Sequence, residues 1–217
     1  MFAVIFEVQP KPERWDDYLA LAKQLKPKLE AIDGFIDNER FGSKRTEGCV
    51  LSLSIWRDEK SVVRWRTQGE HHGVQRKGRS EVFAGYHLRV GEIVADNAPP
   101  NGITVEERRF DETETGDAKF CSITELSPAG AEQMPEPDPR EHGLLDHELF
   151  ESITNPGKLL ILASWRDKAA AEKWRPAGSD RIRHRLVRVI RDYGMFDRRE
   201  APQFYPAAAR NQGEAQQ

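Results

Sequence analysis

The apolar and polar positions change their period several times along the first part of the chain. Residues 2–8, FAVIFEV, are rich in branched and aromatic side chains and are closely followed by Pro10, a pattern typical of a strand. From residue 13 to residue 32, apolar side chains recur at steps of three and four, which predicts an amphipathic helix. Gly34 then supplies a residue suited to closing that helix.

The following segments complete a βαββαβ order. Residues 35–42 alternate weakly and residues 49–56 alternate cleanly, so we expect a strand at each. Asp58 is placed to cap a second helix, which is expected to continue in pieces to about residue 84. Residues 86–94, YHLRVGEIV, predict the last strand.

The chain then repeats itself at a constant spacing. Trp56 and Trp165 are 109 positions apart, and so are Trp65 and Trp174. The segment GFIDNERFGSK, which begins at Gly34, matches GLLDHELFESI at the same spacing in its Gly, Asp, Glu and Phe residues. One ungapped spacing over so long a stretch indicates a duplicated domain.

The duplication predicts the domain organisation. We expect a first domain at residues 1–96, a linker at 97–117, a second and degenerate domain at 118–202, and a disordered tail at 203–217. The tail is assigned from its composition, AAARNQGEAQQ at its end, which is small and polar.

The second copy departs from the first after its opening strand, which is expected at 119–126. Four prolines follow that strand and exclude the long helix found at this point of the first copy. They are Pro128, Pro135, Pro137 and Pro139. Residues 181–200, RIRHRLVRVIRDYGMFDRRE, predict a helix and the start of a final strand.

On a helical wheel, the apolar residues of this last segment form one stripe. The stripe consists of Ile182, Leu186, Val189, Ile190 and Tyr193. His184 falls on the opposite face, together with Arg181, Arg188 and Arg191. Because a wholly apolar stripe leaves no polar group for chemistry, we expect the first copy to hold the functional site.

The second helix of the first copy carries a titratable group on its apolar stripe. His71, Val74, Gly78 and Val82 follow each other at steps of three, four and four, so His71 is expected to face the sheet. Gly78 is expected to leave space at the interface. A histidine aimed into such a cleft suits a general base or a group that orients a substrate. The alternative is a core histidine bonded to a backbone carbonyl.

The first copy resembles the antibiotic-biosynthesis monooxygenase domain family. The residues that carry the resemblance are Trp56, Arg57, Trp65, Glu70, His71, Gln75, Gly78, Arg79, Phe83 and Tyr86. The resemblance covers residues 2–94 well and 119–200 more loosely. It implies a ferredoxin-like fold whose sheets pair face to face, usually between two chains.

The expected fold class is α+β, with two tandem ferredoxin-like (βαββαβ) repeats that form an intramolecular dimeric α+β barrel. A four-stranded sheet with helices on one face leaves its other face apolar, and that face must be covered. A second copy on the same chain covers it at high effective concentration. The repeat is therefore expected to be an internal pseudo-dimer, and further pairing into a homodimer stays open.

The resemblance implies a pocket between the sheet and its helices, with His71 as the catalytic residue. The expected substrate-binding residues are Trp65, His72, Gln75, Arg79 and Tyr86. Three of them have a simpler alternative. Trp65 can be a core residue, Arg79 can form a surface ion pair instead of holding an anionic or phenolate oxygen, and Tyr86 can cap the sheet edge.

These features favour a cofactor-independent monooxygenase-like enzyme, an oxidoreductase, that acts on a small aromatic or quinol-type compound. Two alternatives remain. One is a non-catalytic binding or stress-response protein for a small hydrophobic ligand, and the other is a haem-binding protein that uses His71 or His72. The first strand has no Asn, so the Asn, Trp and His set of haem-degrading relatives is incomplete.

The composition of the chain limits the classes of molecule that it is expected to bind. The net charge of −3 argues against a nucleic-acid partner, and the chain shows no secretory signal and no apolar run long enough for a membrane span. We therefore expect a cytoplasmic protein whose partner is a small molecule. No nucleotide or flavin motif and no metal-ligand spacing is present, so no cofactor and no metal are expected. Cys49 and Cys121 are expected to be reduced structural thiols.

Overall fold

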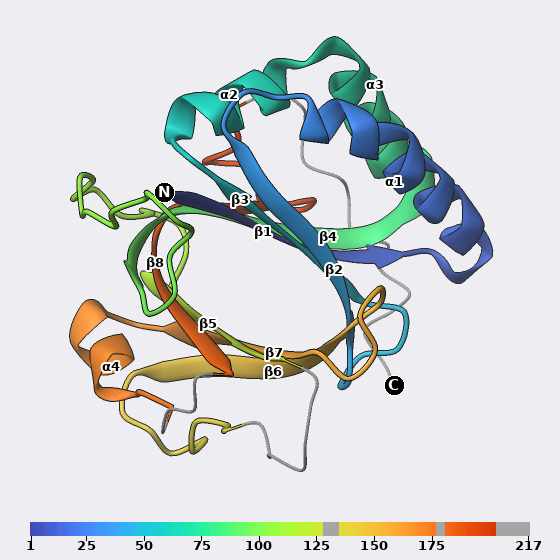
Figure 1. The fold of residues 1–217 in the computed structure, drawn as a ribbon. Coiled ribbons are helices and arrows are strands. Elements are labelled where there is room, and N and C mark those ends of the chain that lie inside the picture. Colours follow the sequence, from blue (N-terminus) through green and yellow to red (C-terminus); the bar gives the residue numbers. More distant parts are fainter. Residues whose placement is uncertain (128–134, 177–180, 203–217) are drawn as a thin grey trace.

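The computed structural model describes residues 1–127, 135–176 and 181–202 (Figure 1). The proposed tail at 203–217 lies outside the described residues. The first half contains β1 (Phe2–Pro10), α1 (Trp15–Glu30), β2 (Phe35–Ser43), β3 (Val50–Trp56), α2 (Glu59–Thr67), α3 (Gly69–Lys77), a π-helical turn (Gly78–Val82) and β4 (Phe83–Asp96). The second half contains β5 (Phe120–Leu126), β6 (Leu144–Ser152), β7 (Leu159–Trp165), α4 (Lys168–Lys173) and β8 (Ile182–Gly194).

The strands of both halves close into one barrel. The strand order around it is β1-β3-β2-β6-β7-β5-β8-β4, and every pairing between neighbours is antiparallel. The halves meet at two seams, where β2 pairs with β6 and β4 pairs with β8. The expected fold class is confirmed: two tandem ferredoxin-like repeats form an intramolecular barrel.

The apolar interior of the barrel is contributed equally by the two halves. Its fully buried side chains include Ile5, Phe41 and Leu51 from the first half and Phe150 and Leu160 from the second. Each sheet therefore covers the inner face of the other, which is the reason that the duplicated sequence gives one closed barrel.

The internal two-fold symmetry extends to polar contacts at the seam between β2 and β6. Ser43 Oγ donates a hydrogen bond to Glu148, and Ser152 Oγ donates one to Glu39 at 2.5 Å. Each serine and each glutamate is 109 positions from its counterpart. The two contacts are therefore reciprocal, as in the interface of a two-fold symmetric dimer.

The outer faces of the two sheets are covered unequally. Figure 1 shows α1, α2 and α3 over the sheet of β1–β4, whereas the short α4 lies over the second sheet. The start of α2 follows from its sequence, because the Asp58 carboxylate accepts a hydrogen bond from Ser61 N at 2.8 Å. Gly34, before β2, has a φ of 89°, a value that favours glycine.

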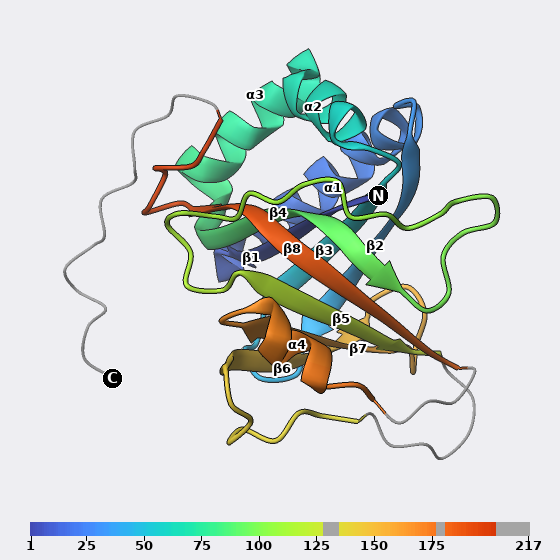
Figure 2. The ribbon, with the colours of Figure 1, turned by 90° about the vertical axis from the view of Figure 1, so that its left-hand side faces the viewer.

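The expectation of a helix at the start of residues 181–200 is wrong. Residues 182–194 form the single strand β8, which lies between β4 and β5 (Figure 2). A strand that is buried on both faces has no clean alternation, and two register shifts against β4 disturb the period further. His184 therefore does not lie on an arginine-rich helix face. Its Nδ1 is 2.9 Å from Thr124 Oγ1, and its ring contacts Trp174.

Candidate active site

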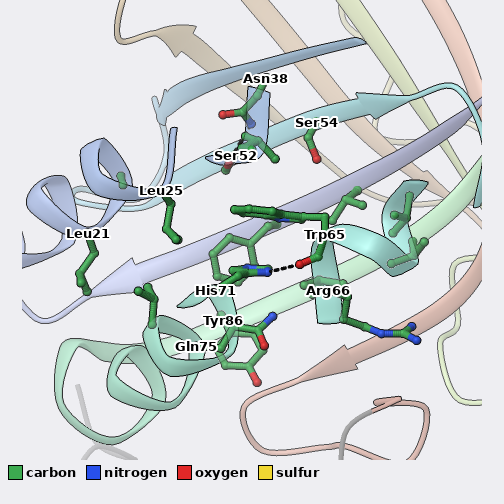
Figure 3. A pocket seen from close by; sticks show the side chains of 18 of the residues that line it. Leu21, Leu25, Asn38, Ser52, Ser54, Trp65, Arg66, His71, Gln75 and Tyr86 are labelled. Atoms are coloured by element: carbon green, nitrogen blue, oxygen red, sulfur yellow. Dashed lines mark hydrogen bonds between the residues drawn. The ribbon is translucent and has the colours of Figure 1, made fainter. Parts of the chain in front are cut away.

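A cavity of about 210 Å³ lies between the outer face of the first sheet and helices α1–α3 (Figure 3). Most of its wall is apolar and includes Val4 on β1, Leu25 on α1 and Leu88 on β4. Strand residues that point away from the barrel interior form its floor, and the helices form its roof. The cavity occupies the position that the sequence predicts, between the sheet and its helices.

Five of the six predicted site residues line this cavity. They are Trp65, His71, Gln75, Arg79 and Tyr86. His72 is exposed and is not among the residues that line it. The reason is geometric, since consecutive residues of a helix project about 100° apart and His71 already points to the sheet. The catalytic or binding roles of the other five stay predictions.

His71 is held on two sides by Trp65. The two rings are stacked, with centroids 4.0 Å apart and an angle of 14° between their planes. His71 Nδ1 lies 2.9 Å from the carbonyl oxygen of Trp65 (Figure 3). A short break between α2 and α3 allows this contact, and Gln68 caps α3 by accepting a hydrogen bond from His71 N at 2.6 Å.

The Trp65 carbonyl also fixes the tautomer of His71. A carbonyl oxygen only accepts hydrogen bonds, so Nδ1 carries the proton and donates it. Burial lowers the pKa of His71 to about 4, although the bond to the carbonyl acts in the opposite direction. The ring is therefore neutral at pH 7, and Nε2 is its hydrogen-bond acceptor. Such a group can orient a hydroxyl and receive its proton.

Gly78 does not leave the space that the helical stripe suggests. A Cβ atom at this position would lie 2.5 Å from Cε2 of Phe83. The Phe83 ring fills the site, since both residues are buried and Phe83 also contacts Tyr18 and Tyr86. Gly78 therefore serves the packing of the π-helical turn on β4.

Cavity residues from α1, β2, β8 and the segment after β8 are not among those predicted from the sequence. Tyr18, Arg40, Arg191, Tyr193 and Arg198 all line the cavity. The Tyr86 hydroxyl accepts a hydrogen bond from Arg198 Nη1 at 2.5 Å. Burial raises the pKa of Tyr193 to about 12. No local motif marks these residues, because the barrel topology alone brings them to one place.

The second half packs the corresponding surface with apolar side chains. Ile161, Ala163, Trp165 and Ala170 form a buried cluster there, and Trp174 packs against it. Trp174 is the counterpart of Trp65, but it contacts Trp165 instead of bordering the cavity. The cavity described above is thus lined by the first half, β8 and the segment after it.

Other kinds of site find little support in the described part of the chain. It contains no group of three or more His, Cys, Asp or Glu residues arranged to hold a metal ion. Cys49 and Cys121 are free thiols, and burial raises the pKa of both, that of Cys49 to about 11. No described helix has the length and apolar character needed to cross a membrane.

Comparison with known proteins agrees with this architecture. The family model "Antibiotic biosynthesis monooxygenase" matches residues 1–77 and 131–179. A jasmonate monooxygenase from Pyricularia oryzae is 44% identical over 222 residues, covering 96% of this chain and 100% of that protein.

Two solved structures are more distant. An antibiotic biosynthesis monooxygenase is 17% identical, with a TM-score of 0.40, over 44% of this chain and 100% of its own. An anthrone oxidase-like protein is 10% identical, with a TM-score of 0.38, over 93% of this chain and 96% of its own. The family match and the Pyricularia relative lead to one conclusion: the chain belongs to the antibiotic biosynthesis monooxygenase family.

Proposed function

We propose that the protein is a cofactor-independent monooxygenase that acts on a small aromatic or quinol-type compound in the cytoplasm. The observation that carries this proposal is the state of His71, a neutral imidazole of fixed tautomer on the wall of a largely apolar cavity. Family membership supports the reaction class.

In the proposed reaction the substrate supplies all the electrons. A phenol hydroxyl donates its proton to His71 Nε2, and the resulting phenolate is electron-rich enough to react with O₂. One oxygen atom enters the substrate at an activated CH₂ group and the other leaves as water, so CH₂ and O₂ become C=O and H₂O. The electrons of the two C–H bonds reduce O₂.

The residues around His71 support the proton transfer. The Trp65 carbonyl accepts a hydrogen bond from Nδ1–H and so stabilises the imidazolium that forms when Nε2 is protonated. The Trp65 ring covers one face of the imidazole, and apolar side chains of α1 and the sheet exclude water from the reacting group. Because the pKa of His71 is low in the protein without substrate, the protonated imidazole gives up its proton readily.

The Pyricularia relative suggests a second substrate, a jasmonate-type molecule. This candidate is favoured by the charges on the cavity wall, where one carboxylate, Glu59, accompanies six cationic side chains among the described residues. The cationic residues are Lys26, Arg40, Arg66, Arg79, Arg191 and Arg198. Such a wall attracts an anion.

Isotope labelling tests the proposed reaction. The purified protein, incubated with 1,8-dihydroxyanthrone under ¹⁸O₂, is expected to give the anthraquinone with one ¹⁸O atom, detected by mass spectrometry, at a rate well above that in buffer. Jasmonic acid is tested in parallel. Tight binding of both compounds without ¹⁸O incorporation into either would contradict the proposal and favour a non-catalytic binding protein.

The pH dependence of the reaction should report the lowered pKa of His71. Because the neutral imidazole is the active form, kcat/KM for 1,8-dihydroxyanthrone should stay level as the pH falls to 5 and be halved near pH 4. An acid limb near pH 6.5, the ordinary histidine value, would contradict this role.

Circular dichroism at each pH provides the control. The folded-state pKa lies below the unfolded one, so the unfolded chain binds more protons between about pH 6.5 and 4. His71 therefore makes the fold less stable as the pH falls through this window. Activity that is lost with the ellipticity unchanged is due to titration and not to unfolding.

A further inference from the structure

The two halves carry different side chains at the strand positions that form the floor of the cavity. Arg40 on β2 pairs with Ser52 on β3, and the equivalent residues of the second half, 109 positions later, are Leu149 and Ile161. Leu149 and Ile161 belong to an apolar cluster. In the second half, this face of the sheet is therefore packed with hydrophobic side chains. In the first half, the guanidinium of Arg40 occupies the equivalent position.

Nearby polar groups on the floor already have partners. Asn38 Nδ2 donates to Ser52 Oγ at 3.2 Å and to the Leu53 carbonyl at 3.0 Å, and Ser54 Oγ accepts from Trp56 Nε1 at 2.9 Å. Figure 3 shows Asn38, Ser52 and Ser54 on the floor of the cavity. These bonds satisfy the amide and give the two hydroxyls a structural role. They do not extend to Arg40.

Arg40 and Tyr18 are the exceptions. Arg40 forms no ion pair with any carboxylate of the described residues, and its buried Nε makes no hydrogen bond of normal geometry there. Tyr18 is 5% exposed, and its hydroxyl lies beside the Arg40 guanidinium, with no other hydrogen-bond partner among the described residues. Both line the cavity. Burial raises the pKa of Tyr18, and the positive charge of Arg40 and a hydrogen bond from its side chain oppose this effect.

A guanidinium with an unbonded Nε and no carboxylate partner among the described residues is costly in an apolar wall unless an anion binds to it. An arginine matches the two oxygens of a carboxylate, and a neutral tyrosine hydroxyl can donate to the same group. We propose that Arg40 and Tyr18 form an anion subsite, and that the aromatic or quinol-type substrate carries a single carboxylate that binds there. The inference rests on the proposed function, since it concerns the substrate of the same cavity.

The subsite is tested by calorimetric titration at pH 7 with 2-naphthoic acid, which is ionised, and with its uncharged methyl ester. The wild type is expected to bind the acid at least about 30-fold more tightly than the ester, as charge-assisted hydrogen bonds allow. Arg40→Leu should reduce this preference to within about threefold while the ester binds as before. Equal binding of acid and ester by the wild type, or no binding of the acid, would overturn the proposal.

Three variants separate charge from packing. Arg40→Lys keeps the charge without the planar fork and should retain part of the preference, and Tyr18→Phe keeps the ring and should lose about three- to tenfold. Arg64→Leu removes an arginine of α2 that pairs with Asp33 and does not line the cavity, and it should change nothing. A preference that survives Arg40→Leu, or that Arg64→Leu abolishes equally, would refute the subsite.

The position tolerates the main substitution, because Leu149 occupies the same place in the second half. If Arg40→Leu nevertheless fails to fold, Arg40→Lys and Tyr18→Phe still decide the question. 2-Naphthol, which is neutral at pH 7, should behave like the ester, and equal weakening of naphthol and naphthoate by Arg40→Leu would mean that Arg40 contributes only packing. Binding that follows these expectations without ¹⁸O incorporation would leave the subsite intact and remove the proposed reaction.

Discussion

Replacing His71 with Ala is expected to lower the turnover of 1,8-dihydroxyanthrone at least about a hundredfold. The imidazole is the acceptor for the phenol proton in the proposed reaction, and a positioned base contributes about 10²- to 10⁴-fold. The ring lies on the cavity wall and not in the barrel interior, so the melting temperature should fall by only a few degrees, roughly what 1–2 kcal/mol gives in a chain of this size. Steady-state kinetics and thermal unfolding measure the two effects separately.

Two matched variants sharpen this test. His72→Ala removes an adjacent histidine that lies outside the cavity, and its turnover should stay within about threefold of the wild type. His71→Gln can accept a hydrogen bond but does not take up a proton, so it separates a base from a group that only orients the substrate. If His71 acts as a base, both His71 variants should lose turnover. If it only orients the substrate, His71→Gln should retain turnover. Near-normal turnover by His71→Ala would remove His71 from the mechanism.

Gly91→Ala is expected to lower the free energy of unfolding by at least about 3 kcal/mol, with a fall of about 10 °C in the melting temperature. Gly91 lies on β4 at a register shift opposite β8, where the two halves join. A Cβ atom there would lie 2.2 Å from the carbonyl oxygen of Arg188 and 2.6 Å from Cγ1 of Val187. The nearest atom belongs to the backbone, so relief requires the seam itself to move.

Gly42→Ala is the matched control, since Gly42 lies at the other seam between the halves. The closest atom to its added Cβ would be the Glu151 carbonyl oxygen at 4.0 Å, an ordinary contact. Its free energy of unfolding should change by less than about 1 kcal/mol. Chemical denaturation compares the two variants. Equal stability of both would show that β4 and β8 do not pack as closely as the structure describes.

The architecture could be predicted from the sequence because it depends on a repeat. The constant spacing of Trp56 and Trp165 indicates two equivalent sheets, and sheets with one bare face must pair. The alternation at residues 49–56 and the capping of α2 by Asp58 are local signals that the structure confirms. Pairing between the halves then follows from burial alone.

The error at residues 182–194 has a physical origin. Ile182, Leu186 and Val189 stand at helical steps, yet β8 is covered on both faces and bonded to strands on both sides, so its apolar positions follow no single period. Tertiary hydrogen bonding with β4 and β5 overrides the local pattern.

Only those residues of the candidate site that share one helical segment could be predicted from the sequence. His71 and Gln75 share a helical segment, so their common direction follows from the helical period. Arg40 and Tyr18 come from β2 and α1, and no spacing in the sequence relates them to His71. Comparison of β2 with β6 in the folded chain identifies Arg40, because it shows a charge where the other half has Leu149.

In the duplicated barrel, we expect a single ligand-binding cavity, and we expect it to lie in the first half. A crystal structure of the protein with bound 2-naphthoate is the decisive test. We expect one ligand per chain between the sheet of β1–β4 and helices α1–α3, with the ring system beside His71 and Trp65. A ligand bound on the outer face of the β5–β8 sheet, or a His71 ring turned into solvent, would contradict this expectation.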